Sequence, residues 1–213
     1  MSAINIPEKT IERLSEYRRT LRSCHEQGIT HIFSHVIAGM HGITAVQVRR
    51  DLMLIGFSSD TKKGYDVEVL IDFINSILDS PNVQNIAIIG MGHLGKAITK
   101  YFNSKEHNLR IVASFDVDPE KLGQIIDGIP CYHMDEFESK VDQLDINIVV
   151  LSSPTEVAAD LVVPIINAGI KGVLNFTSKP LNFPRGIVVE NYDITTLLEK
   201  VAYFVKENEE SNL

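Results

Sequence analysis

Cysteine and long hydrophobic runs are scarce in this chain of 213 residues, and each scarcity excludes a class of protein. The two cysteines, Cys24 and Cys131, lie far apart without the spacing of metal ligands, so we expect both to be buried or idle. This usage fits a reducing cytoplasm. No run of about 18 apolar residues is present, which argues against a membrane-spanning helix. Residues 1–8 lack a basic region and a long apolar segment, so no signal peptide is predicted.

Positive charge is also in short supply, with 20 Lys and Arg against 28 Asp and Glu and a net charge of −8. That balance alone argues against a nucleic-acid partner. The charge is uneven, however: residues 1–63 carry +3 and four of the seven histidines, whereas residues 64–213 carry −11. This asymmetry predicts two parts with different partners, and chance clustering is the alternative because +3 is modest.

Three helices are predicted in the first part of the chain. Residues 7–26 repeat apolar side chains at helical spacing, and residues 31–40 indicate a second, short helix that Gly42 ends. A third helix follows from Thr44, a residue suited to cap it, and extends to about Met53. Two short helices joined by a tight glycine-containing turn are typical of a helix-turn-helix.

The third helix and the segment after it carry the residues that we expect to contact DNA. Ala45, Val48 and Leu52 share the face that would pack inward, which places Gln47 and Arg50 on the outer face. Residues 54–66 indicate a polar hairpin with a basic tip, as in the wing of a winged helix. A solvated basic helix face is the alternative. The predicted DNA-binding residues are Thr44, Gln47, Arg49, Arg50, Lys62 and Lys63.

The rest of the chain alternates strands and helices. An amphipathic linker helix is expected over residues 66–80, so the predicted domains are a winged-helix domain, 1–80, and a Rossmann-like domain, 82–213. The expected strands are 85–90, 110–116, 129–132, 146–151, 171–175 and 187–189, and the expected helices are 93–102, 155–168 and 193–207. This alternation predicts an α/β fold with a parallel sheet covered on both faces.

A glycine-rich turn joins the first of these strands to its helix. Its residues are Gly90, Met91, Gly92, His93, Leu94 and Gly95, in the G-x-G-x-x-G spacing. Gly90 allows the tight turn, Gly92 lets the backbone approach a pyrophosphate, and Gly95 lets helix and strand pack closely. The amino end of the following helix then faces the phosphates. The alternative is a structural turn in a nucleotide-free domain.

A carboxylate follows the second strand at the position expected for a ribose ligand. Asp116 lies 21 residues after Gly95 and would accept hydrogen bonds from ribose hydroxyls, which favours NAD(H) over NADP(H). A solvated acid or a helix cap is the alternative role. Ser152, Ser153 and Asn175 follow later strands at the same sheet edge, where they would line the cofactor site or serve as turns and caps.

Five further stretches are distinctive when taken together: Ile43–Leu52 in the expected third helix, Ile89–Gly95 in the glycine turn, Phe115–Gly123 at the second strand, Ala168–Phe176 at a late strand and Val188–Asp193 before the final helix. In their sequences and in their order they resemble the Rex family of redox-sensing transcriptional repressors, and the resemblance covers about residues 5–205. The segment Phe57–Tyr65 departs from the family, with fewer glycines and with lysine in place of arginine.

The resemblance implies a homodimeric repressor that binds a double-stranded DNA operator at a low NADH/NAD⁺ ratio and releases it when NADH binds. It implies that the final helix is exchanged between subunits and that Tyr101 lies near the nicotinamide. It also implies that Asp193 and Arg19 form a pair that changes with the redox state. The sequence shows no convincing catalytic dyad, so no catalytic residue is predicted. Two other functions remain open: an NAD-dependent oxidoreductase and a CoA-binding module.

Overall fold

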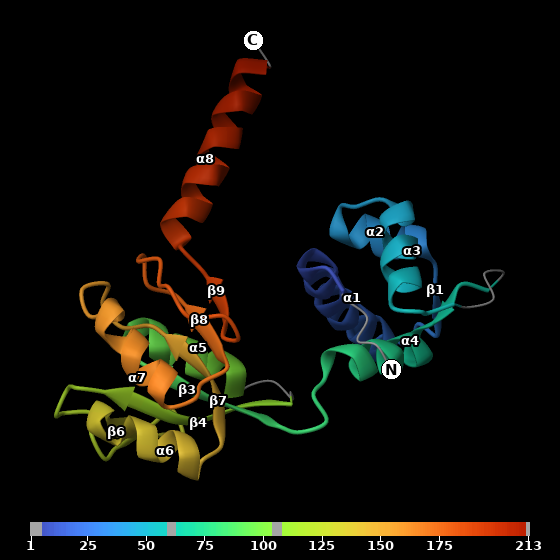
Figure 1. Cartoon of the computed structure of the whole chain (residues 1–213). Helices are drawn as coiled ribbons and strands as arrows, with labels where there is room; N and C mark the ends of the chain where they lie inside the picture. The colour runs from blue at the N-terminus through green and yellow to red at the C-terminus, as the bar shows by residue number, and fades with distance from the viewer. Residues whose placement is uncertain (1–5, 59–62, 104–107, 212–213) are drawn as a thin grey trace. The chain divides into compact units, whose positions relative to one another are not determined.

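The structure is a computed structural model that describes residues 6–58, 63–103 and 108–211. Its contacts divide the chain into two compact units, Met1–Pro81 and Asn82–Leu213, which are treated separately below (Figure 1). Across the described part of the chain, no helix is long and apolar enough to cross a membrane. Cys24 and Cys131 are both buried free thiols.

The described part of the N-terminal unit contains four helices and a two-stranded ribbon. In chain order these are α1 (Glu8–Glu26), β1 (His31–Ile32), α2 (Ser34–His41), α3 (Ala45–Leu54), β2 (Tyr65–Asp66) and α4 (Val67–Leu78). The core is built where the apolar stripes of the helices meet, with Leu14, Leu21, Leu52 and Leu70 all at most 1% exposed. Gly42 ends α2 in the left-handed region, at φ 64°, which favours glycine.

One local prediction for this unit is wrong. Residues 31–40 are not one helix, because Ile32 is buried in an extended strand and pairs with Tyr65 of β2. The partner strand is remote in sequence, so local periodicity does not reveal it. The middle of the expected hairpin, residues 59–62, lies outside the described residues, so the hairpin stays a prediction. Of its described parts, Leu54 still belongs to α3, and β2 pairs antiparallel with β1.

The C-terminal unit is built on a seven-stranded sheet in the order β5-β6-β4-β3-β7-β8-β9. All neighbours are parallel except β5 and β6. The strands are β3 (Gln84–Ile89), β4 (Leu109–Asp116), β5 (Ile125–Ile126), β6 (Ile129–His133), β7 (Ile146–Leu151), β8 (Gly172–Asn175) and β9 (Val188–Asn191). When β5 is left out and the other six strands are numbered along the chain, their order across the sheet is 3-2-1-4-5-6. This is the strand order of dinucleotide-binding folds, so the predicted Rossmann-like sheet is confirmed.

Helices cover the two faces of this sheet (Figure 1). On one face, Ile86 and Ile88 pack in a cluster with Ile98 and Phe102 of α5 (His93–Asn103). On the other, Ala87 and Ile89 belong to a cluster that takes in α6 (Phe137–Gln143) and α7 (Val162–Asn167). Successive side chains of a strand point to opposite faces, which is why one continuous apolar run supplies both cores.

The helix expected over residues 155–168 is shorter than predicted, and several short elements were missed. A 3₁₀ helix, Ala158–Leu161, precedes α7, which begins only at Val162. Pro164 lies in the first turn of α7, where its missing N–H costs no helical hydrogen bond. The short strand β5 and helix α6 were not predicted, because segments of two and seven residues carry too little periodicity.

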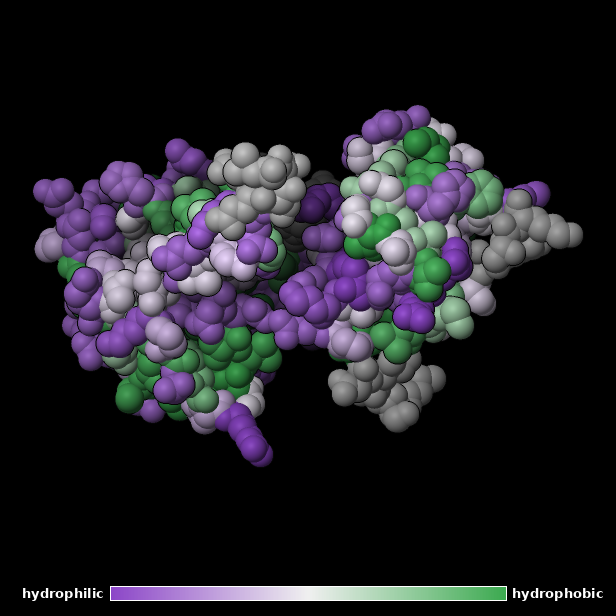
Figure 2. All heavy atoms as spheres, turned by 90° about the horizontal axis from the view of Figure 1, so that it is seen from above, coloured by the Kyte–Doolittle hydropathy of each residue, from purple (hydrophilic) through white to green (hydrophobic). Residues whose placement is uncertain are grey.

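The last helix, α8 (Ile194–Ser211), exposes an apolar stripe. Its start is capped by Asp193, whose Oδ1 accepts a hydrogen bond from the Thr195 amide at 3.0 Å. Ile194 is 57% exposed, Leu198 64% and Val201 60%, and every described side chain from 194 to 208 is exposed. Hydrophobic areas also interrupt the hydrophilic surface in the space-filling view (Figure 2). An amphipathic helix of this kind requires an apolar surface to cover.

Candidate functional site

The glycine-rich turn lies between the end of β3 and the start of α5. Gly90 has φ 96°, and a Cβ there would lie 2.6 Å from the Ser153 amide nitrogen, so neither backbone nor space admits a side chain. A Cβ on Gly95 would meet the carbonyl oxygen of Gly90, which keeps the helix close to the strand. At Gly92, by contrast, a Cβ would meet nothing within 4 Å. Neighbouring protein atoms therefore leave no room for a side chain at Gly90 and Gly95, whereas the space beside Gly92 is open.

The other residues of the turn have different environments. Met91 is fully buried in the core beneath α5, so only its backbone is available to the site. His93 is exposed, and Leu94 is half-buried in the first turn of α5. Because the first amides of a helix lack helical partners, this end of α5 favours an anion.

Asp116 ends β4 and binds back to the turn. Its Oδ2 accepts a hydrogen bond from the Met91 amide at 2.8 Å, and its Oδ1 accepts from the Val117 and Asp118 amides at 2.8 and 3.0 Å. Burial alone would raise the pKa of Asp116, but these bonds and a lysine ammonium outweigh it, so the pKa lies below its ordinary value. The side chain is thus a fixed anion at the sheet edge.

That lysine is Lys121, a residue that sequence reasoning missed. Its Nζ lies 2.9 Å from Asp116 Oδ2 and 3.3 Å from Asp118 Oδ2. Contact with these carboxylates raises the pKa of Lys121, so it is a cation at neutral pH. The i, i+5 spacing from Asp116 matches no helix or strand period. The one sequence signal for Lys121 was a basic residue shortly after the acid expected to bind the ribose.

A cavity of about 660 Å³ opens at the carboxyl ends of β3, β4 and β7. The residues that line it include Gly90, Gly92, Asp116, Lys121, Ser152, Ser153, Met134, Val157 and Leu161. It lies where the chain order of the strands reverses, the position at which open α/β sheets bind ligands. The structure therefore brings five of the predicted cofactor residues to one cavity, with one cation and an apolar wall added.

The two serines differ in their bonding. The Ser152 hydroxyl donates to the Gly90 carbonyl at 2.8 Å, which fixes the turn. The Ser153 Oγ is buried, and it is the only such side-chain atom without a hydrogen-bond partner among the described residues. Ser153 is consequently the one of the two that retains a hydroxyl for a ligand.

Asn175 is not available to a ligand as the structure stands. It is fully buried, and its Nδ2 donates to the Lys179 carbonyl at 3.0 Å and to Asn191 Oδ1 at 2.8 Å. Its Oδ1 accepts from the amide and the hydroxyl of Thr177. All its bonding capacity is therefore used to hold the loop after β8 against β9, which corrects the expectation that it lines the cofactor site. Tyr101, on α5, is 55% exposed and does not line the cavity.

In the N-terminal unit, the predicted DNA-binding residues of α3 differ in exposure. Thr44 caps the helix by accepting from the Gln47 amide at 3.1 Å. Arg49 and Arg50 are exposed, and Arg49 donates to Ser34 Oγ at 3.1 Å. Gln47 is only half-exposed, and its Nε2 donates to Asp51 Oδ1 at 3.0 Å, so its DNA-binding role stays a prediction. Lys63 is exposed, and Lys62 lies outside the described residues.

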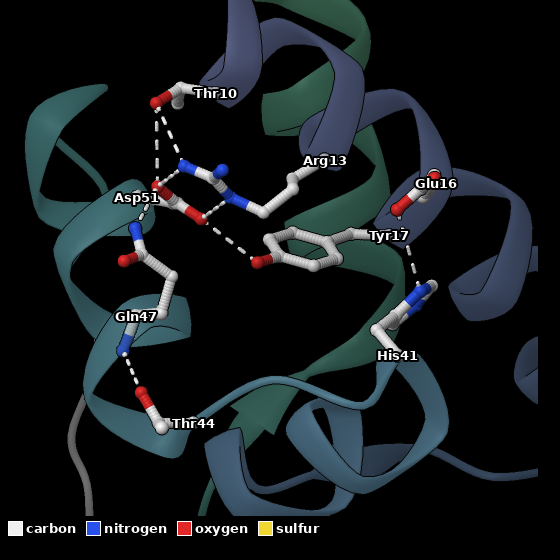
Figure 3. A network of polar contacts seen from close by, with 8 residues as sticks. All are labelled: Thr10, Arg13, Glu16, Tyr17, His41, Thr44, Gln47 and Asp51. Carbon is white, nitrogen blue, oxygen red and sulfur yellow. Dashed lines mark hydrogen bonds and ion pairs between the residues drawn. The ribbon is translucent and has the colours of Figure 1, made fainter. Parts of the chain in front are cut away.

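Asp51 ties α3 to α1 through a buried network (Figure 3). Its side chain is 2% exposed and accepts from Arg13 Nε and Nη2, both at 2.7 Å. The Tyr17 hydroxyl donates to the same carboxylate at 2.9 Å. A bidentate arginine–carboxylate pair fixes both partners in one geometry. The network therefore sets the orientation in which α3 is presented.

Replacing Asp51 by asparagine is expected to lower the free energy of unfolding of the N-terminal unit by about 1–3 kcal/mol, because Arg13 and Tyr17 lose a charged acceptor. Burial would raise the pKa of Asp51, but hydrogen bonds from Arg13, Tyr17 and Gln47 outweigh it and lower the pKa. Its contribution is therefore full above the unfolded pKa of about 3.9 and is lost as the pH falls through the folded value.

Native-state hydrogen exchange of the α1 and α3 amides measures that free energy without the other unit. The difference between the wild type and Asp51→Asn should shrink as the pH falls below about 3.9. The exposed acid Glu12 supplies a control, Glu12→Gln, that should change the free energy by less than about 0.5 kcal/mol. Equal protection in the wild type and Asp51→Asn at pH 7 would show that the network does not stabilise the unit.

The predicted switch residues lie in different units. Arg19 is exposed on α1, and Asp193 caps α8, with Oδ2 also accepting from the Thr196 hydroxyl at 2.8 Å. The expected pair would join two subunits, so it stays a prediction. No group of three or more His, Cys, Asp and Glu in the described part of the chain is arranged to hold a metal ion.

The chain joins a helix-turn-helix unit to a Rossmann-like sheet whose glycine-rich turn favours an anion. This combination defines a class of protein: DNA-binding regulators that respond to a nucleotide. Comparison with known proteins bears on each unit. Residues 5–52 match the family described as putative DNA-binding protein N-terminus, and residues 82–179 match the CoA binding domain.

Full-length relatives narrow the class to one family. The redox-sensing transcriptional repressor Rex of Leuconostoc citreum is 36% identical, over 94% of this chain and 93% of that protein. The protein of the same name from Anoxybacillus flavithermus is 35% identical, over 94% of each chain. The chain belongs to the Rex family of redox-sensing transcriptional repressors, whose members are named as repressors rather than as enzymes.

Solved structures agree with this assignment. RSP, a Rex-family repressor in complex with β-NAD⁺ and operator DNA, superposes with a TM-score of 0.88 and 28% identity, covering 97% of this chain and 95% of that one. RSP in complex with β-NADH gives a TM-score of 0.86 at 28% identity, with 98% of each chain covered.

Proposed function

We propose that this chain represses transcription by binding an operator when the NADH/NAD⁺ ratio is low and releases that operator when NADH binds. The observation that carries the proposal is that RSP, similar over nearly the whole chain, is known both with β-NADH and with β-NAD⁺ plus operator DNA. Both kinds of site have counterparts in this chain. Such a repressor acts on chromosomal DNA, so we place it in the cytoplasm.

The cavity at the sheet edge fits NAD(H). The open approach at Gly92 and the amino end of α5 suit a pyrophosphate, and Asp116 suits a ribose diol. Val157, Leu161 and Met134 supply an apolar wall for the adenine ring. When bound, the cofactor supplies a nicotinamide whose charge and planarity differ between redox states. We assign Tyr101 to the nicotinamide end on the family resemblance.

The exposed basic residues of α3 support the DNA contact. Arg50 is expected to reach base edges or phosphates, and replacing it by alanine should weaken operator binding by about 1–3 kcal/mol if it contacts a base. Fluorescence anisotropy with a duplex selected from a random pool, repeated across a salt series, measures both the affinity and the charge contribution.

The matched control for Arg50→Ala is Lys9→Ala, which removes one positive charge from α1, at a side chain 76% exposed. It should leave operator affinity within about twofold of the wild type. Equal affinities and equal salt slopes for Arg50→Ala and the wild type would exclude α3 as the helix that contacts the operator.

A homodimer accounts for the bare stripe of α8. We propose that α8 packs on the partner subunit and that Asp193 at its start pairs with Arg19 on the partner's first helix. Such an exposed ion pair contributes only about 0–1 kcal/mol of free energy. It therefore shifts the balance between two dimer forms but does not by itself produce the change from one form to the other. In a two-fold dimer the operator would be palindromic.

One other ligand has a specific observation in its favour. The match of residues 82–179 to the CoA binding domain makes coenzyme A a candidate for the same cavity. Direct titration distinguishes the two: NADH should bind and displace operator DNA, whereas coenzyme A should neither compete with NADH nor release the DNA. Release of the duplex by coenzyme A alone would overturn the assignment to NADH.

A further inference from the structure

Lys121 is the one basic side chain among the described residues that line the cofactor cavity. It follows β4 in the turn after Asp116, and its side chain is 25% exposed, so the ammonium is at the cavity surface rather than in the core. Neither the glycine motif nor the ribose-binding role of Asp116 accounts for a cation at this place.

Lys121 differs in kind from the other donors to Asp116. Three of the four hydrogen bonds to that carboxylate come from backbone amides, which the turn and the strand end hold in place. The fourth comes from Lys121 Nζ, at the end of a flexible side chain. When a ribose hydroxyl approaches Asp116, Lys121 is therefore the donor that can move aside.

The local charge also depends on Lys121. Asp116 and Asp160 are carboxylates that line the cavity, and Asp118 lies beside Lys121. The ammonium, within 3.3 Å of Asp116 and Asp118, compensates one of these negative charges. A ribose phosphate brings a further charge of about −1.5 to −2, like other phosphomonoesters. The carboxylates repel it, and the lysine attracts it.

We propose that Lys121 determines how strictly this site rejects an adenosine ribose that carries a phosphomonoester. Paired with Asp116 and Asp118, it is screened, and the site accepts the free diol of NADH. Without Asp116 it is the cation that holds the ribose phosphate. The inference rests on the proposed NAD(H) function. Its ligand chemistry is shared by the 2′-phosphate of NADPH and the 3′-phosphate of coenzyme A.

A purely structural role for Lys121 makes a different prediction. If the lysine only braced the turn after β4, its removal would weaken NADH and NADPH binding by the same factor. If it contacts the ribose phosphate, its removal changes the ratio of the two affinities. The ratio is therefore the quantity to measure.

The test is a double-mutant cycle in the full-length protein, with the variants Lys121→Met, Asp116→Asn and both together. Affinities for NADH and NADPH are measured by isothermal titration calorimetry, along with those for 2′,5′-ADP and 3′,5′-ADP, which carry the phosphomonoester on one hydroxyl or the other. Lys100→Met is the control, because Lys100 ion-pairs with Asp127 at 3.6 Å outside the cavity lining.

We expect Asp116→Asn to bind NADPH at least about tenfold more tightly than the wild type, and the double variant to lose that gain. Lys121→Met alone should widen the preference for NADH several-fold, and Lys100→Met should leave it unchanged. Preference for 2′,5′-ADP or 3′,5′-ADP in Asp116→Asn shows which phosphomonoester the lysine reaches.

An equal gain for NADPH with and without Lys121 would overturn the proposal, as would an unchanged affinity ratio in Lys121→Met. Failure of the wild type to bind NADH would instead refute the proposed function. In that case the titrations with 2′,5′-ADP and 3′,5′-ADP still test the role of Lys121. Binding of either compound to Asp116→Asn that is lost in the double variant supports that role, and absence of such binding refutes it.

Discussion

Replacing Gly92 by valine is expected to abolish NADH binding, with an affinity loss of at least about a hundredfold, while the C-terminal unit stays folded. A Cβ at Gly92 meets no protein atom within 4 Å, so the valine side chain has room. That room is the cavity mouth beside the start of α5, where the pyrophosphate would approach the backbone. The hundredfold loss corresponds to about 2.7 kcal/mol of binding free energy.

Gly95 provides the matched control for this prediction. A Cβ there would meet the Gly90 carbonyl, so Gly95→Val should unfold or strongly destabilise the unit. Calorimetric titration with NADH and thermal unfolding, performed on both variants, separate loss of ligand from loss of fold. NADH binding by Gly92→Val at the wild-type affinity would show that the pyrophosphate does not pass this glycine.

Ending the chain at Asn191 is expected to convert a dimer into a monomer or to leave the protein insoluble. The truncation removes α8 with its exposed apolar side chains, including Leu197, Leu198, Val201 and Phe204, each at least 50% exposed in the single chain. Full burial of each such side chain contributes about 1.5–3 kcal/mol, so their sum is far larger than any exposed ion pair.

Sedimentation equilibrium measures the predicted change, and a milder variant guards against insolubility. Leu197→Ser with Val201→Ser keeps the length of α8 and should weaken dimerisation by at least about a hundredfold. Substitutions at the polar positions Thr195 and Glu199 should leave it unchanged. A truncated protein that remains dimeric and releases DNA in response to NADH would refute the exchanged helix.

Much of the C-terminal fold could be predicted because its signals are local. The runs that form β3, β4 and β7 are continuous and apolar, as expected for strands buried on both faces, and the glycine spacing marks the turn between β3 and α5. The pairing of β1 with β2 could not be predicted, since it joins two-residue strands separated by α2 and α3.

The site shows the same division between local and long-range information. Gly92 and Asp116 could be located because motif spacing encodes them, and the structure places both at one cavity. Gln47 was assigned to the outer face by helical position alone, which does not reveal that a buried carboxylate four residues later holds its amide. Asn175 and Lys121 depended on loops that bring their partners close, and no sequence period describes such loops.

The central claim is that NADH and operator DNA bind different forms of one dimer, and reciprocity tests it most directly. NADH affinity should be measured by calorimetry with the free protein and with the protein saturated by a selected operator duplex, and operator affinity with and without NADH. Linkage requires both affinities to fall by the same factor, expected to be about 5- to 150-fold, with little change for NAD⁺. Equal NADH affinity in the presence and absence of the duplex would contradict the account.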